Sequence, residues 1–334
     1  AEELGADWSQ VYVVPEPQTG AFHLPGTGMA GTAESTSVRK QYTALREVGA
    51  TARTLLVTAA AQRWNVDPSS LKVEAGQVIG GPEGDALDFG ALVKDAKALP
   101  MPEDISLKEA SNFTLIGTSP PPKGLSDIVN GTRVYGLDVE VEGMVYAAVR
   151  HAPVLGGEIA NLNDLSLEGT GAEAVVKVPG GFAVVANSYW KANQIALSLD
   201  AVFSEPDEGV NFSTENYRAD MEDAIVGKGV YEALSEGDAE IALEEATTTI
   251  EAKYEVPFLA HACMEPMTAT AHVREEGCEI WAPIQSAAQL GAAVAEALEL
   301  SADQVVIHRT YLGTGFGRKT ETDFGVQAAL ISKA

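Results

Sequence analysis

The chain has 334 residues, of which 46% are hydrophobic and 21% are charged, as in ordinary globular proteins. A chain of this length buries more than one core, so we expect more than one domain. Its 22 basic and 48 acidic side chains give a net charge of −26. This charge argues against binding to nucleic acid or to an anionic membrane surface, because both need a basic face.

Cysteine and histidine are too few to build a metal centre from side chains alone. Cys263 and Cys278 cannot form a disulfide framework or a zinc site, and we expect free, buried thiols. A single disulfide between them is geometrically possible if residues 269–273 and 279–281 form a hairpin. The sequence has no iron–sulfur cysteine pattern, and no metal-ligand spacing among His23, His151, His261, His272 and His308. Any redox metal must therefore arrive in an organic cofactor or sit in another subunit.

Three features of the sequence as printed suggest an excised or processed piece. It has no starting methionine and no signal peptide, and it ends at Ala334 within an apparent helix. It also has no run of about eighteen apolar residues, the length that a membrane-spanning helix needs.

The first third of the chain predicts one long helix accompanied by strands and a second helix. The expected elements, in order, are a strand at 7–15, a Gly- and Pro-rich loop at 16–31, a helix from about 41 to 64, a strand at 71–79, a tight turn at 80–82 and a helix at 89–98 capped by Asp88. The long helix is predicted from apolar positions at three- and four-residue spacing, namely Leu45, Val48, Ala52, Leu55, Leu56 and Ala59.

Residues 118–124, which contain three consecutive prolines, predict a stiff connector and a domain boundary. A small α+β unit follows, with strands expected at 144–150, 174–178, 182–186 and 201–203 and a helix at 189–199. Residues 204–237 are acidic and predict a surface connection with one helix at 214–225. The last third predicts a strand at 247–255, a helix at 287–298 and a strand at 305–308.

The final expected strand leads into a glycine-rich loop, Leu312-Gly313-Thr314-Gly315-Phe316-Gly317. Glycine tolerates positive φ and lets a backbone approach a ligand closely, and such loops present bare N–H groups to cofactor oxygens. The loop is neither a dinucleotide fingerprint nor a P-loop. Taken alone, the loop is better explained as a strand-to-helix turn with an aromatic plug.

Other blocks place this loop in a context that resembles a known family. The ordered blocks are 256–267 (Val-Pro-Phe-Leu-Ala-His-Ala-Cys-Met-Glu-Pro-Met), 281–286 (Trp-Ala-Pro-Ile-Gln-Ser) and 311–319, which holds the loop. Together they resemble the molybdenum-binding subunit of the xanthine dehydrogenase superfamily, in the branch typified by the isoquinoline 1-oxidoreductase β subunit. Residues 131–138 and 143–153 resemble the start of that family's hammerhead domain, and residues 1–8 a segment well inside its polypeptide.

The resemblance implies a mixed α+β fold. Part of it would be a molybdopterin-binding domain, joined to a small aldehyde oxidase/xanthine dehydrogenase a/b hammerhead-like domain. The implied division assigns 1–117 and 247–334 to the molybdopterin-binding domain, 128–204 to the hammerhead-like domain and 205–246 to an acidic connector.

The resemblance also implies a function. The chain would be a fragment of a molybdenum hydroxylase that oxidises an N-heteroaromatic compound or an aldehyde, with water as the oxygen source. The implied cofactor is molybdopterin, with the molybdenum cytosine dinucleotide as a candidate form that the sequence does not fix. The implied partners are a small 2Fe–2S subunit and a downstream electron acceptor. The implied location is the periplasm, with the cytoplasm as the alternative.

The resemblance assigns site residues position by position. The cofactor-binding set is Gly313, Gly315, Phe316, Gly317, Thr32, Ser35, Ser37 and Gln285, and the substrate cleft set is His261, Glu265 and Thr320. Several have a structural alternative: the hydroxyls of residues 32–37 as helix N-caps, Glu265 as a buried carboxylate satisfied by backbone amides near the end of a strand, and Gln285 as a packing or turn residue.

The chain also departs from the family pattern. Ala33 and Glu34 replace two glycines, and Leu259 replaces a glutamine found in other relatives. Thr314 replaces a glycine, which predicts either a negative φ there or a slightly repositioned loop. Thr320 stands where purine-oxidising relatives carry a glutamate, which argues against xanthine as the substrate.

The family's general-base glutamate lies in a C-terminal segment that this sequence does not contain. We therefore expect the isolated piece to be inactive and free of cofactor. The alternative hypothesis is a non-catalytic binding or scaffold module that keeps the fold without the cofactor.

Overall fold

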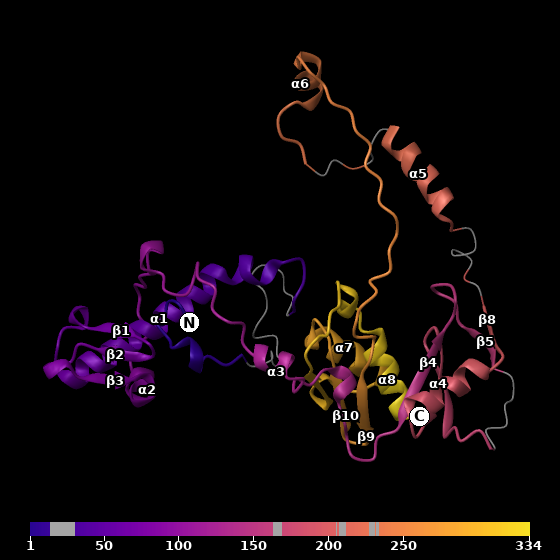
Figure 1. Ribbon diagram of the computed structural model, residues 1–334, viewed down its shortest axis with the longest axis horizontal. Coiled ribbons are helices and arrows are strands. Elements are labelled where there is room, and N and C mark those ends of the chain that lie inside the picture. Colours follow the sequence, from indigo (N-terminus) through magenta and orange to yellow (C-terminus); the bar gives the residue numbers. More distant parts are fainter. Residues whose placement is uncertain (14–30, 163–168, 205, 207–211, 227–230, 232–233) are drawn as a thin grey trace. The chain divides into compact units, whose positions relative to one another are not determined.

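The computed structural model describes residues 1–13, 31–162, 169–204, 206, 212–226, 231 and 234–334. The chain forms two compact units, which are considered separately (Figure 1). Unit 1 combines Ala1–Val139 with Cys263–Lys333, and unit 2 consists of Glu140–Ala262 together with Ala334. Unit 2 is thus inserted into the sequence of unit 1.

The N-terminal part of unit 1 is built on the long helix α1. The elements are α1 (Thr36–Trp64), β1 (Lys72–Glu74), β2 (Gln77–Ile79), β3 (Ala86–Asp88) and α2 (Phe89–Lys97). The strands form an antiparallel sheet in the order β1-β2-β3. Leu56, Ala59, Ala60, Val78 and Leu92 are buried in a shared core. The N-terminal half of the expected apolar face is not buried, because Leu45 and Val48 are 61% and 65% exposed.

Buried carboxylates hold the start of the chain. The Glu2 carboxylate accepts hydrogen bonds from the backbone N–H groups of Thr114 (2.9 Å), Leu115 (2.6 Å) and Ile116 (3.0 Å). Burial by itself raises the pKa of Glu2, but these N–H groups and Lys108 outweigh it and lower the pKa to about 2. The neighbouring Glu3 forms ion pairs with Arg46 and Arg53 of α1.

The C-terminal part of unit 1 is a three-stranded sheet covered by two helices. The elements are β9 (Thr270–Arg274), β10 (Gly277–Ala282), α7 (Ala287–Leu298), β11 (Val305–Arg309) and α8 (Asp323–Lys333). The order is β11-β10-β9, with β9 antiparallel and β11 parallel to β10. Helix α7 is the crossover between the parallel strands, as such a pair requires. Ile280, Ile284, Leu290, Val294 and Phe324 lie in its core.

Unit 2 has its own small core and two further helices. The elements are β4 (Tyr146–His151), β5 (Ile159–Leu162), β6 (Ala174–Val178), β7 (Gly181–Ala186), α4 (Tyr189–Ser198), β8 (Ala201–Phe203), α5 (Thr214–Val226) and α6 (Ala239–Glu245). Strands β4, β7 and β6 form an antiparallel sheet, and β5 pairs with β8. Phe182, Val184, Ala192 and Ala196 pack between the sheet and α4.

Most predicted elements are present, and helix 287–298 has the predicted bounds. The hairpin at 269–281 is confirmed, and both cysteines are free thiols, Cys278 buried and Cys263 partly exposed. Three strand predictions are wrong. Residues 7–13 form a short turn capped by Asp7, the run 71–79 is two strands separated by a turn, and residues 248–260 form no strand. The structure adds β3, β5, α6 and the short helix α3 (Leu125–Val129), which the sequence did not suggest.

The 71–79 run breaks because Ala75 and Gly76 both have positive φ (46° and 83°), which an extended strand does not accept. Positions 14–15 of the first predicted strand, the loop at 16–30 and His23 lie outside the described residues.

In the described part of the chain, no helix combines the length and the apolar character needed to cross a membrane.

Candidate functional site

The glycine-rich loop follows β11 and turns sharply three times. Thr314, Phe316 and Gly317 have positive φ values of 89°, 50° and 93°. Only Gly317 adopts this conformation without steric cost, so the other two must be held by their surroundings. The turn at Phe316 directs its ring outward, where it is 70% exposed. The aromatic is therefore not a plug in the core.

A buried ion pair holds the loop from beneath. The Glu265 carboxylate accepts hydrogen bonds from the N–H groups of Gly313 (2.7 Å) and Gly136 (2.9 Å) and pairs with the ammonium group of Lys319. Glu265 is 6% exposed and Lys319 is 0% exposed. Glu265 is therefore a buried carboxylate that accepts hydrogen bonds from backbone amides, as its structural alternative predicted. The expectation that it ends a strand is wrong, because residues 263–268 are irregular.

The segment before Glu265 runs alongside the loop and bonds to it at each step. The thiol of Cys263 donates to the Gly315 carbonyl at 3.1 Å, and the Met264 N–H donates to the Thr314 hydroxyl at 2.9 Å. The Glu265 N–H donates to the Gly313 carbonyl at 3.0 Å. The predicted negative φ at Thr314 is wrong, because its φ is 89°. The Thr314 hydroxyl accepts the hydrogen bond from the Met264 backbone N–H, and this bond helps to offset the cost of a positive φ at a β-branched residue.

Gln285 connects the loop to the approach of α1. Its backbone N–H donates to the Lys319 carbonyl at 2.9 Å, and its side-chain amide donates to the Thr32 carbonyl at 2.6 Å. The Thr32 N–H returns a bond of 3.1 Å to the Gln285 carbonyl. These bonds bring the start of α1 beside the loop, although the two are more than 250 residues apart in the sequence.

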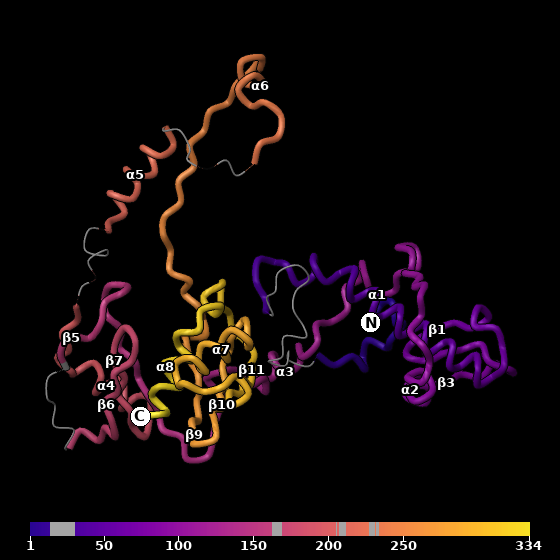
Figure 2. The backbone as a smooth tube through the Cα atoms, turned by 180° about the vertical axis from the view of Figure 1, so that it is seen from behind, coloured from indigo at the N-terminus to yellow at the C-terminus, as the bar shows by residue number. Residues whose placement is uncertain are grey.

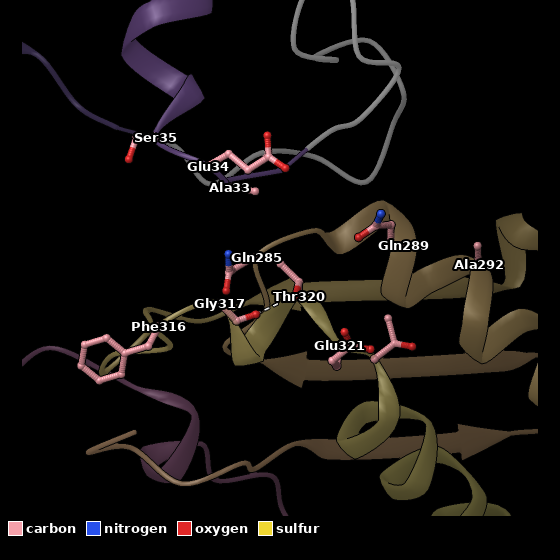
Figure 3. Close-up of a pocket in the computed structure, with 11 residues that line it drawn as sticks. Ala33, Glu34, Ser35, Gln285, Gln289, Ala292, Phe316, Gly317, Thr320 and Glu321 are labelled. Atoms are coloured by element: carbon pink, nitrogen blue, oxygen red, sulfur yellow. Dashed lines mark hydrogen bonds between the residues drawn. The ribbon is translucent and has the colours of Figure 1, made fainter. Parts of the chain in front are cut away.

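An open cleft of about 900 Å³ lies between the approach to α1 and the loop (Figure 3). Its lining residues are Ala33, Glu34, Ser35, Gln285, Gln289, Ala292, Phe316, Gly317, Thr320, Glu321 and Thr322. Figure 3 shows the amides of Gln285 and Gln289 on one side of the gap and residues 33–35 on the other. Ser35 precedes α1 with φ of 53°, and its hydroxyl makes no capping bond within the helix. The hydroxyl is therefore not used as an N-cap.

The cleft contains five of the eleven predicted site residues, namely Ser35, Gln285, Phe316, Gly317 and Thr320. The other members of unit 1 lie next to it without lining it. Gly313 and Glu265 are part of the support beneath the loop, Gly315 approaches Gln285, Thr32 contributes its backbone, and Ser37 is in the first turn of α1. His261 belongs to unit 2, where it is exposed.

The sequence analysis did not select Lys319, Gln289 or Glu321. Gln289 could have been found, because it occupies the first turn of the predicted helix 287–298, four residues after Gln285. Lys319 carries no such signal, since it follows Arg318 and the pair looks like an exposed basic patch.

The charges around the cleft favour a neutral ligand edge over a phosphate. Glu34 and Glu321 line the cleft, while Arg318 and Lys319, which follow the loop, are engaged elsewhere. Arg318 binds Asp323 through two hydrogen bonds of 2.8 and 2.6 Å, and Lys319 is buried against Glu265. Burial raises the pKa of Asp323, but the Arg318 guanidinium outweighs this and lowers it, so the pair is charged at neutral pH. Amides and hydroxyls that both donate and accept suit the edge of a pterin ring.

Comparison with known proteins gives one family and several relatives. A family model described as a molybdopterin cofactor-binding domain matches residues 223–334. The membrane-bound aldehyde dehydrogenase (pyrroloquinoline-quinone) of Gluconacetobacter polyoxogenes is 30% identical over 358 residues. The isoquinoline 1-oxidoreductase β chain of Brevundimonas diminuta is 28% identical over 392 residues, and one of the nicotinate dehydrogenase subunits of Pseudomonas putida is 25% identical over 341 residues.

These alignments take in 100% of this chain but only 44%, 48% and 28% of the respective relatives, so the chain spans less than half of their length. Among solved structures, the quinoline 2-oxidoreductase of Pseudomonas putida 86 aligns with a TM-score of 0.46 and 16% identity, covering 64% of this chain and 32% of that one. Because this TM-score is below 0.5, the relationship rests on the sequence comparisons.

Proposed function

Because the chain is related to the molybdopterin-binding large subunits of xanthine dehydrogenase-like molybdenum hydroxylases, we propose that it is part of such an enzyme. The proposed reaction is the oxidation of an N-heteroaromatic compound or an aldehyde, with water as the oxygen source. The names of the relatives include both substrate classes, and identities between 25% and 30% do not separate them. The core of unit 2 is proposed to be the hammerhead-like domain.

The observation that carries this proposal is the cleft beside the glycine-rich loop. Its exposed Phe316, its bare backbone at Gly317 and its row of neutral amides and hydroxyls form a surface for a flat ligand with a hydrogen-bonding edge. Gly317 leaves open space where a side chain would begin, since a Cβ there would meet nothing within 4 Å.

The residues present fit the pterin ring of molybdopterin. Gln289 and the Ser35 hydroxyl would bind the ring edge, and the backbone at Phe316–Gly317 would lie against its face. The carboxylates of Glu34 and Glu321 favour a phosphate position outside this cleft. When bound, the cofactor supplies the two-electron chemistry at molybdenum, and the protein supplies binding, orientation and electrostatics.

The proposed partners are a small 2Fe–2S subunit and a downstream electron acceptor, and the proposed location is the periplasm. The isolated 334-residue chain is expected to be inactive, because it spans less than half of the length of the relatives that it matches.

The test compares two glycines in the complete enzyme, with this chain, the rest of its large subunit and the small subunit expressed together. Gly317 and Gly84 have nearly equal positive φ values (93° and 87°), and neither would bring a Cβ within 4 Å of another atom. Alanine at either position therefore has a similar backbone cost, roughly 1–2 kcal/mol, but only Gly317 lines the cleft. We expect Gly317→Ala to lower molybdenum and pterin per subunit several-fold and Gly84→Ala to leave them unchanged.

Molybdenum is measured by mass spectrometry and pterin by fluorescence after oxidation. The extract is also assayed for quinone, because the name of one relative includes pyrroloquinoline quinone. Equal molybdenum and pterin contents in the two variants would contradict the proposed site.

The alternative is a scaffold module without cofactor, and the two carboxylates in the cleft favour it. A complete complex that folds and assembles yet contains no molybdenum or pterin would support that alternative. The flanking coding sequence also discriminates, since a downstream Gly-Glu motif and a neighbouring iron–sulfur gene support the enzyme.

A further inference from the structure

The segment at residues 247–258 of unit 2 has the sequence pattern of a strand, but it pairs with no strand in the described part of the chain. Apolar residues at 250, 252, 254 and 256 alternate with charged residues at 251, 253 and 255, a pattern typical of a half-buried strand. The chain is nevertheless irregular over residues 248–260, and every residue there is exposed. Figure 2 shows a single extended trace after α6.

Helix α5 occupies one side of this segment. Glu255 forms an ion pair of 2.5 Å with Arg218, and Lys253 pairs with Glu222. Residues two apart in an extended chain point to the same side, and residues four apart on a helix share one face. The two ion pairs therefore align the charged side of the segment with one face of α5. Phe258 does not follow this alternation, because its position has the parity of the apolar row but its ring contacts α5, with its centroid 5.1 Å from that of Tyr217.

The opposite side carries the apolar row and is uncovered. Ile250, Tyr254 and Val256 are 89%, 91% and 86% exposed. An extended segment with an apolar face and unpaired backbone groups is a ready template for another strand, and proteins generally cover such edges. Helices α5 and α6 bury none of their residues, so the described part of this region has no core of its own.

We propose that residues 248–256 form a β-strand against a sheet contributed by the rest of the large subunit. The family model covers residues 223–334, so most of this region belongs to a recognised domain and is not a free tail. Two relatives match over only 44% and 48% of their length, which leaves more than half of each subunit to supply a partner. Main-chain bonds to a sheet edge would give affinity, and the apolar row would fix the register. This inference rests on the relationship that underlies the proposed function.

Hydrogen–deuterium exchange tests the proposal. The probe is the polypeptide that carries the rest of the subunit in the same organism, either fused to this chain or added to it. In the chain alone, we expect the amides of residues 248–256 to exchange at the rate of an unstructured peptide. With the probe bound, we expect exchange to slow at least tenfold. Unchanged exchange in a formed complex overturns the proposal. So does protection that appears in the chain alone with rising concentration, because the partner is then a second copy.

Two lysine substitutions separate the two sides of the segment. Tyr254→Lys places a charge in the apolar row, whereas Thr249→Lys makes the same charge change at a position that alternates with that row. Tyr254→Lys should abolish the protection and weaken binding of the probe at least tenfold, and Thr249→Lys should preserve both. Equal effects of the two substitutions overturn the proposal. Molybdenum content is measured in the same complexes: protection without molybdenum contradicts only the proposed function, and molybdenum without protection contradicts only this inference.

Discussion

Lys319 and Glu265 support the glycine-rich loop of the site, although both side chains are buried and neither lines the cleft. A buried ion pair contributes little over an apolar pair, but removing one partner leaves an uncompensated charge in the interior. Here the remaining charge would be Glu265, which also holds the N–H groups of Gly313 and Gly136. The loop and the segment at 136 would then lose a shared anchor.

We predict that Lys319→Met destabilises unit 1 by about 3–5 kcal/mol. The matched control is Arg318→Met, because Asp323 in its pair is 44% exposed and half-exposed pairs contribute about 0–1 kcal/mol. Urea unfolding of both variants is compared, and the coupling is measured from Lys319→Met, Glu265→Gln and the Glu265→Gln/Lys319→Met double variant. A cost for Lys319→Met no larger than that for Arg318→Met would show that the pair does not support the loop.

Helices and hairpins that are stabilised by contacts between residues close in the sequence were predicted from the sequence pattern. Helix 287–298 and the hairpin before it follow from residue spacing alone. The segment at residues 247–255 has a strand pattern, but a strand also needs a neighbour, and no local pattern reveals whether one is present. The cleft was predicted only in part for the same reason. Ser35 and Phe316 could be selected from their motifs, whereas the Glu265–Lys319 pair joins two positions 54 residues apart.

The contact between α7 and α8 depends on a glycine that the sequence presents as an ordinary helix residue. A Cβ on Gly325 would lie 2.5 Å from Cδ1 of Leu290, whereas a Cβ on Gly90 would meet nothing within 4 Å. Both glycines are in the first turn of a helix. We predict that Gly325→Ala destabilises the protein by about 1–3 kcal/mol through overpacking, and that Gly90→Ala stabilises it by roughly 0.5–1 kcal/mol.

Thermal unfolding of the two alanine variants side by side measures the difference. If both substitutions stabilise, the helices are not in the close contact described.

The chain carries 48 acidic side chains and a net charge of −26. Its stability in acid depends on which of these carboxylates accept hydrogen bonds or form ion pairs in the folded state and which are only solvated. Glu2 belongs to the first class, with a pKa lowered from 4.5 to about 2. A carboxylate whose pKa is lower in the folded state than in the unfolded state stabilises the fold at pH values above the pKa of the unfolded state. Its contribution is complete above about pH 4.5 and is lost as the pH falls towards 2.

We predict that Glu2→Gln lowers the stability at pH 7 by roughly 3 kcal/mol, and that the difference from the unmodified protein disappears between pH 4.5 and pH 2. Denaturant unfolding across this range measures it, with the exposed Glu74→Gln as control. If the stability difference between Glu2→Gln and the unmodified protein stays unchanged at pH 2, the negative charge of the Glu2 carboxylate is not what stabilises the fold.

The hydrogen bond from the Gly136 N–H to Glu265, at 2.9 Å, joins the two points where the chain leaves unit 1 and returns to it. A long excursion that departs and re-enters at one spot has its ends closed by the host, so its length adds only a slowly growing entropic cost. The entropic cost of closing this junction therefore depends only weakly on the length of unit 2. The same Glu265 carboxylate closes the junction and supports the glycine-rich loop.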